Sequence, residues 1–183
     1  RHARAAIGAL VVIGGANVTT QVLKKEILER PDFGLGVHNS LPSGHVTVVA
    51  AATAALLLVI GPMLRATMAG IGTLATALTG LSTIVAGWHR PADVVAALLI
   101  VLGWCAVGAI VAGGNRVNQS EVLFTTFSGA VAALVGIVLI GVRPVNGLEG
   151  IFDAAIVLGA VAAATALAIS IMAWICPVLT HQP

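Results

Sequence analysis

Two short polar stretches carry the side chains of this sequence that could do chemistry. The first is Pro42-Ser43-Gly44-His45, which opens directly into an apolar run. A serine in that position can cap a helix, a glycine lets a ligand approach the backbone, and the unpaired N–H groups of a first helical turn attract an anion. The pattern predicts a cradle for a phosphate group. An ordinary loop-to-helix junction with an interfacial histidine is the alternative.

The second stretch runs from Trp88 to Asp93 and places His89 four residues before Asp93. Pro91 suits the first turn of a helix, so Asp93 falls near the N-terminus of that helix. A carboxylate there can accept the N–H of His89, fix its tautomer and stabilise its positive charge when the imidazole attacks a substrate. The alternative is an aspartate that only stabilises a helix start, beside a histidine at the level of the lipid head groups.

The elements that must position these stretches are membrane helices. Of the 183 residues, 58% are hydrophobic and only 9% are charged, whereas a soluble domain of this size carries about a quarter charged residues. The apolar residues recur with a helical period rather than alternating. We therefore expect an all-α, polytopic membrane helix bundle that forms a single transmembrane domain over residues 1–183.

Six apolar runs approach or exceed the about 20 residues that a bilayer requires. They are Ala5–Leu23, His45–Pro62, Met68–Gly87, Asp93–Gly113, Val122–Val142 and Ile151–Cys176. All are rich in Ala, Gly and Val, which lets helix backbones approach closely, so we expect a compact bundle. Cys105 and Cys176 fall inside apolar runs, which favours packing over a disulfide or a metal site.

Alternation of six helices puts the Lys24–His45 loop and the Trp88–Asp93 loop on the same side of the membrane. The opposite side then receives short basic connections, which are typical of the cytoplasmic side. These carry Arg1, Arg4, Arg116 and, in an expected loop from Pro62 to Thr67, Arg65. This distribution predicts that the two polar stretches face the extracytoplasmic side.

Composition also bears on source, partners and cofactors. A chain rich in Ala, Gly and Val, with short loops and no tyrosine, suggests a bacterial plasma membrane. The net charge of +2 with no basic run speaks against nucleic acid as a partner. No acidic cluster that would hold a metal is present, and no cofactor is expected. The chain does not begin with methionine and Arg1-His2-Ala3-Arg4 abuts the first apolar run, so we expect a preceding segment, which could include another helix.

Taken together, these residues resemble the type 2 phosphatidic acid phosphatase superfamily, the lipid phosphatases related to vanadium haloperoxidases. The resemblance rests on an upstream lysine and Arg30-Pro31, on Pro42-Ser43-Gly44-His45, and on His89 with Asp93. It covers residues 24–113 as a catalytic core. Two further helices, over residues 122–176, lie beyond it.

The resemblance implies a role for each matching residue. His89 corresponds to the nucleophile that forms a phosphohistidine, Asp93 to its orienting partner, and His45 to the acid that protonates the leaving oxygen and then activates water. The implied phosphate ligands are Lys24, Arg30, Ser43 and the amide of Gly44. Phosphoryl transfer needs in-line positioning and cationic or N–H donors around the equatorial oxygens, which these residue types supply.

Two departures from the family pattern stand out. The family has six residues between its lysine and the Arg-Pro pair, whereas Lys24 leaves five and Lys25 leaves four. The family also has a Ser-Arg pair seven residues before the nucleophile, and here that pair is Ser82-Thr83. Arg90 either replaces the missing phosphate-binding arginine or extends to the lipid head groups, and the sequence leaves both open.

The resemblance implies an integral membrane hydrolase whose partners are membrane lipids and a lipid phosphate or diphosphate substrate. Polyprenyl diphosphate, phosphatidic acid and phosphatidylglycerol phosphate are the candidate classes. The alternatives are a lipid-linked phosphotransferase, and a non-catalytic lipid-binding or transport relative of the family, which the Thr83 departure favours. A haem site on His45 and His89 would leave the other motif residues unexplained. The sequence does not indicate an oligomeric state.

Overall fold

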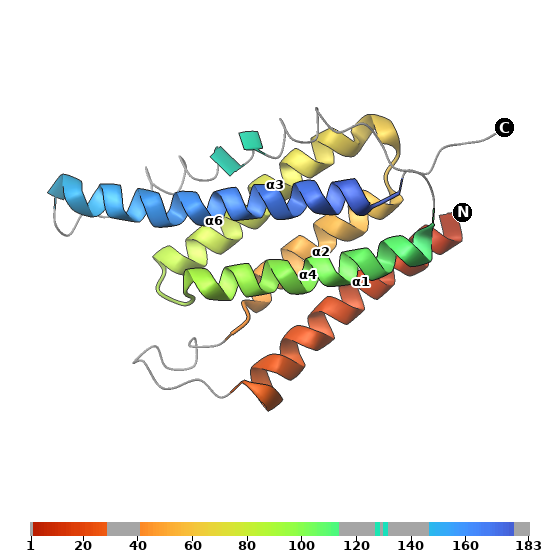
Figure 1. The fold of residues 1–183 in the computed structure, drawn as a ribbon, viewed down its shortest axis with the longest axis horizontal. Coiled ribbons are helices and arrows are strands. Elements are labelled where there is room, and N and C mark those ends of the chain that lie inside the picture. Colours follow the sequence, from red (N-terminus) through yellow and green to blue (C-terminus); the bar gives the residue numbers. More distant parts are fainter. Residues whose placement is uncertain (1, 29–40, 114–126, 129, 132–146, 178–183) are drawn as a thin grey trace.

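The computed structural model describes residues 2–28, 41–113, 127–128, 130–131 and 147–177 of the chain (Figure 1). Every longer element in these ranges is a helix, which agrees with the expected all-α class. The elements are α1 (His2–Val22) with a continuing π-helical turn η1 (Leu23–Ile27), α2 (Gly44–Val59), α3 (Pro62–Val85), α4 (Pro91–Ala112) and α6 (Gly147–Ile175).

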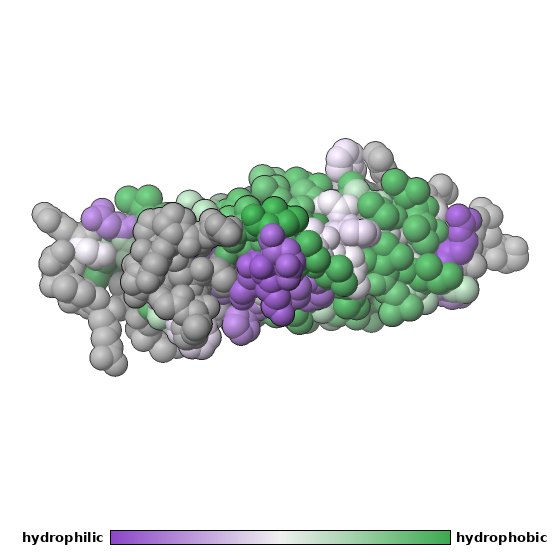
Figure 2. Space-filling model, turned by 90° about the horizontal axis from the view of Figure 1, so that it is seen from below, coloured by the Kyte–Doolittle hydropathy of each residue, from purple (hydrophilic) through white to green (hydrophobic). Residues whose placement is uncertain are grey.

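Four of the described helices are long and apolar enough to cross a membrane, which indicates a membrane protein. They span His2–Ile27, Pro62–Val85, Pro91–Ala112 and Gly150–Ile175. The fifth, α2, has 16 residues. Figure 2 shows that apolar residues cover most of the described surface on one face, while hydrophilic residues gather in one patch and towards the ends.

The sixth expected helix, Val122–Val142, falls largely outside the described residues. Within it the structure describes only residues 127–128 and 130–131, which are helical. Five long helices are therefore described, in the order that the sequence predicts.

The expected loop from Pro62 to Thr67 is wrong, because α3 already begins at Pro62. Proline lacks the backbone N–H that a first helical residue leaves unpaired, and its fixed φ suits this position. Gly61 precedes it in an extended conformation, with φ −71° and ψ 164°. The connection from α2 to α3 is thus very short, and Arg65 lies inside the helix.

The centre of the bundle is α2, which packs against α1, α3, α4 and α6. Small residues allow this close packing. A Cβ atom on Gly8 of α1 would lie 2.5 Å from the carbonyl oxygen of Gly108 on α4, so these two backbones meet directly. The thiols of Cys105 and Cys176 are both buried and free, with their Sγ atoms 3.4 Å apart.

Arg65 was expected to be a cytoplasmic loop cation, but it is almost fully buried (2% exposed). Its guanidinium donates to the carbonyl oxygen of Leu57 (2.9 Å), near the end of α2, and to those of Ala173 and Cys176 (2.6 Å each), at the end of α6. The last carbonyls of a helix lack helical donors and carry its negative dipole end. Residue 177 is a proline, so Ala173 has no i+4 N–H partner. Arg65 therefore joins the ends of three helices.

Replacing Arg65 by methionine should destabilise the protein by about 3 kcal/mol, because three buried carbonyls lose their donors while most of the side-chain volume is kept. Chemical denaturation in detergent measures this loss. Met63→Ala is the matched control, because Met63 is exposed on the same turn of α3 and its removal should change the free energy of unfolding by less than about 0.5 kcal/mol. Equal stability of the two variants would contradict the capping role of Arg65.

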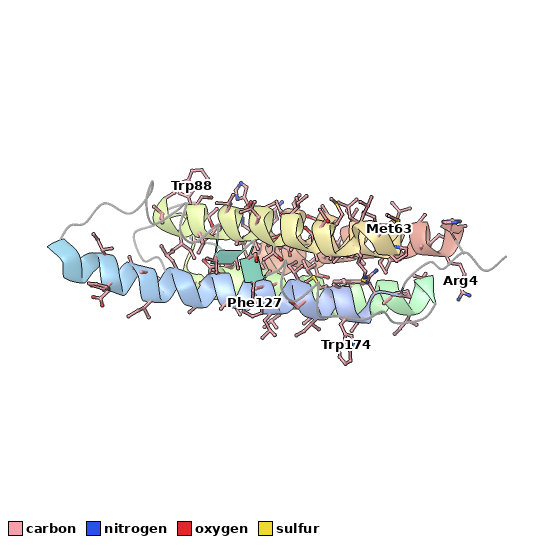
Figure 3. All side chains as sticks on the ribbon, turned by 90° about the horizontal axis from the view of Figure 1, so that it is seen from above. Arg4, Met63, Trp88, Phe127 and Trp174 are labelled. Carbon is pink, nitrogen blue, oxygen red and sulfur yellow. The ribbon has the colours of Figure 1, made fainter. Side chains whose placement is uncertain are left out.

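The two polar stretches of the sequence come together at one end of the bundle. The end of α1, the start of α2, the end of α3 and the start of α4 all lie there (Figure 1). Figure 3 places Trp88 at this end, away from Arg4 and Met63 at the other. The described residues of both stretches therefore lie at the same end of the bundle, as the alternation of the helices predicts.

Candidate active site

Ser43 occupies the position just before α2, and its backbone is held from two sides. Its N–H donates to the carbonyl oxygen of Asp93 (3.0 Å), and its own carbonyl accepts the N–H of Thr47 (3.1 Å). The first bond ties the start of α2 to the start of α4. The expected side-chain cap does not form. Instead the Ser43 Oγ is buried without a hydrogen-bond partner among the described residues, which leaves it available to a ligand.

Gly44 is the first residue of α2, so its amide belongs to the unpaired donors of that helix. A Cβ atom at Gly44 would meet no atom of the described residues within 4 Å. There is accordingly open space for a ligand beside this backbone. The neighbouring hydroxyl of Ser43 and the positive end of the α2 dipole make the space suitable for an anion.

Asp93 is fixed at the start of α4 by a reciprocal pair of hydrogen bonds with Arg90. The carboxylate Oδ2 accepts the Arg90 N–H (2.8 Å), and the Asp93 N–H donates to the Arg90 carbonyl (2.9 Å). Pro91 occupies the first helical position, as the sequence predicts. The Nδ1 of His89 lies 3.4 Å from the same Oδ2, close enough for an ion pair but not aligned for a hydrogen bond. Both side chains are buried, so the carboxylate acts on His89 at short range.

Thr83, at the position of the missing arginine, supports the backbone of the site. Its carbonyl accepts the N–H groups of Trp88 (3.0 Å) and His89 (3.2 Å), while its hydroxyl bonds to the carbonyl of Gly80 on its own helix (2.8 Å). Gly87 turns the chain out of α3 with a φ of +73°, a conformation that favours glycine. Thr83 thus positions His89 but brings no cation.

The two histidines of the predicted pair are neighbours. Their ring centroids are 6.4 Å apart, with the rings inclined at 65°. His45 is exposed on the first turn of α2, and His89 is buried beside Asp93. Trp88, which was not predicted to be a site residue, lies 6.0 Å from His45 between ring centroids. Its place directly before His89 was the only sequence signal for this contact.

Burial lowers the pKa of His89 below its ordinary value, and the nearby charge of Asp93 opposes this shift. Lys24 and His45 lower the pKa further. The neutral imidazole, which is the nucleophilic form, is therefore favoured to a lower pH than in a free histidine.

The effect of a nearby lysine on the pKa of His89 also distinguishes Lys24 from Lys25 as the lysine of the predicted site. Lys24 is half-buried on η1 and contributes to the pKa of His89, whereas Lys25 is exposed. Lys24 is thus the lysine whose charge reaches the site. Arg90 is half-buried at the start of α4, and Arg30 lies outside the described residues.

The described residues thus form a bundle of apolar helices that brings a histidine pair, a carboxylate and a helix start with unpaired donors together at one end, the features on which the family resemblance rests. A family comparison agrees, because the PAP2 superfamily profile matches residues 5–118, more than half of the chain. The chain belongs to the PAP2 superfamily. The match begins before the predicted core, residues 24–113, and so includes α1, while α6 lies beyond it. Comparisons with curated proteins and with solved structures gave no match. Membership suggests phosphatase activity on phosphate esters.

Proposed function

We propose that this protein is an integral membrane phosphatase that hydrolyses a lipid phosphate or diphosphate through a phosphohistidine on His89. The observation that carries the proposal is the placement of a buried His89 against Asp93, with an exposed His45 beside it. A buried, oriented imidazole suits a nucleophile, and an exposed one suits proton exchange with water.

In the first step, Nε2 of His89 attacks the phosphorus atom, because Nδ1 faces Asp93. A P–N bond forms while the bond from phosphorus to the leaving oxygen breaks, and His45 gives that oxygen a proton. The charge that develops on the His89 ring is stabilised by Asp93. In the second step, His45 takes a proton from water, the water oxygen attacks phosphorus, and the P–N bond breaks to release inorganic phosphate.

The phosphate oxygens would be held by the donors that gather at this end of the bundle. The Ser43 hydroxyl and Gly44 amide lie at the start of α2, and Lys24 supplies a charge from η1. Arg30 stays a prediction of the family resemblance. We propose Arg90 as the cation that replaces the missing arginine, because it directly follows His89 at the start of α4, whereas Thr83 carries no charge.

We propose that the substrate carries an apolar tail, because α2 exposes an apolar face on which a hydrocarbon chain can pack. The residues of this α2 stripe are His45, Val48, Ala52, Leu56 and Val59, which follow helical spacing. It begins at the proposed acid/base and continues along a helix that lies between α1 and α3 (Figure 1). A hydrocarbon chain on the stripe would thus leave its phosphate at the histidines. We place this end of the bundle on the extracytoplasmic face of a bacterial plasma membrane.

Phosphate release from a panel of lipid phosphates in detergent, with and without vanadate, tests this function. We expect release that vanadate inhibits. Substituting Ala52 by tryptophan should slow the hydrolysis of long-chain lipid phosphates at least about tenfold, because the bulk lies on the proposed tail path, and should spare a short-chain, water-soluble phosphate ester. Ala163→Trp, on an exposed position of α6, is the matched control and should change neither rate.

Absence of phosphate release from every member of the panel would contradict the phosphatase. Transfer of the phosphoryl group to an added lipid alcohol, without release to water, would identify a phosphotransferase instead. Equal slowing of the long-chain and short-chain substrates by Ala52→Trp would contradict the tail path.

A further inference from the structure

The carbonyl oxygen of Ser43 is the end of a chain of hydroxyl groups that crosses between helices. The Oγ1 of Thr47 donates to this carbonyl (2.9 Å), and the Oγ1 of Thr20 on α1 lies 3.0 Å from that of Thr47. Both threonines are buried. The backbone of Ser43 thus bonds directly to Thr47 of α2 and, through its N–H, to Asp93 of α4, and it is linked to α1 through Thr47.

The direction of this chain follows from its donors. Thr47 has one hydroxyl proton, and the Ser43 carbonyl, which has no proton, takes it. The proton between the two threonines therefore comes from Thr20. The order is Thr20 to Thr47 to Ser43.

The Thr20 hydroxyl differs from other buried hydroxyls of the bundle. Those of Thr53, Thr73, Thr165 and Ser170 donate to the carbonyl four residues earlier in their own helix. This local bond satisfies a hydroxyl in an apolar interior without any partner helix. Thr20 instead reaches across to α2. Its bond thus fixes the position of one helix relative to another.

The same turn of α1 is fastened to α4 as well. Thr19 accepts a hydrogen bond from the indole Nε1 of Trp104 (3.0 Å). Lys24 follows Thr20 by four residues, which is about one helical turn, so the two lie on the same side of the helix. A rotation of α1 that broke the Thr20 bond would also move Lys24, whose charge acts on His89.

We propose that Thr20 and Thr47 are positioning residues of the active site. Their hydroxyl chain holds the Ser43 carbonyl, and with it the Ser43 Oγ and the Gly44 amide, at a fixed place beside His89. It also sets the rotation of α1 that presents Lys24. Neither hydroxyl contacts the substrate. This inference rests on the proposed phosphatase function.

The test is Thr20→Val, which keeps the shape of the side chain and removes its hydroxyl. Misplacement of the Ser43 Oγ and the Gly44 amide should raise KM and the vanadate concentration for half-inhibition by about five- to tenfold, with a smaller change in kcat. Thr20→Ser, which restores the hydroxyl, should return both values to within about twofold of wild type. Thr73→Val is the matched control, because Thr73 is equally buried and its hydroxyl, among the described residues, bonds only to Ala69 of the same helix. It should leave both values unchanged.

The possible outcomes distinguish a failure of this inference from a failure of the proposed phosphatase function. Wild-type protein that neither releases phosphate nor binds vanadate overturns the proposed function and the inference with it. If the wild type is active, a Thr20→Val variant with the same KM and vanadate affinity as Thr73→Val overturns the inference alone. So does a Thr20→Ser variant that fails to restore vanadate affinity. Thr20→Ala serves as a second variant if Thr20→Val does not fold.

Discussion

Replacing His89 by alanine is expected to reduce phosphate release by at least about 10⁴-fold, because the proposed mechanism passes through a bond from this side chain to phosphorus. The fold should survive. His89 lies in the connection between α3 and α4, and the backbone N–H that bonds to the Thr83 carbonyl is kept in alanine. Initial rates on a lipid phosphate, with unfolding midpoints of both proteins in detergent, measure the two effects.

His2→Ala is the control for losing a histidine, because His2 lies at the far N-terminal end of α1, away from the site. It should keep the wild-type rate. Robust phosphate release by a folded His89→Ala protein would contradict the nucleophile and leave the lipid-binding reading or another nucleophile to be considered.

His45→Ala should slow turnover by about 10²–10⁴-fold, because this residue is proposed to give a proton in the first step and take one in the second. The exposed ring, 6.4 Å from that of His89, has access to water for both transfers. The effect should depend on the leaving group. A phosphate ester of a strongly acidic phenol needs little help from an acid, so its first step should be slowed much less than that of a lipid alkyl phosphate.

The leaving-group comparison separates proton transfer from mere damage to the site. With the activated ester, His45→Ala should form the phosphoenzyme and then hydrolyse it slowly. Equal slowing of both substrates, with no phosphoenzyme, would show that His45 acts on binding or structure rather than as the acid and base.

Much of this site could be predicted because its signals are local. Pro42-Ser43-Gly44-His45 and Pro91 mark helix starts through backbone chemistry that adjoining residues determine. The length of the apolar runs then fixes their alternation, which brings His45 and His89 to one end of the bundle. The structure agrees with both inferences, with α2 beginning at Gly44 and α4 at Pro91.

The contacts within the site depend on helix rotation, which no local pattern contains. The Oγ of Ser43, which has no partner among the described residues, and the bond between Thr20 and Thr47 both depend on how α1, α2 and α4 are rotated against one another. The same reason explains the contact between Cys105 and Cys176.

The prediction for Arg65 was wrong because the loop that was expected to carry it is part of a helix. The gap between the apolar runs His45–Pro62 and Met68–Gly87 suggested a cytoplasmic loop that carries Arg65, whereas Pro62 is the first residue of α3. The acceptors of the guanidinium come from two other helices, and Pro177 leaves one of them free more than a hundred residues along the chain. Only the packed bundle brings them together.

The most direct test of the phosphatase mechanism is the capture of its covalent intermediate. Wild-type protein mixed with a lipid phosphate labelled with ³²P and quenched within one turnover should carry label that is labile in acid and stable in base, the stability of a phosphohistidine. Mass spectrometry should place the label on His89, and His89→Ala should carry none. Steady release of labelled phosphate with no label on the protein, or label on a residue other than His89, would contradict the mechanism.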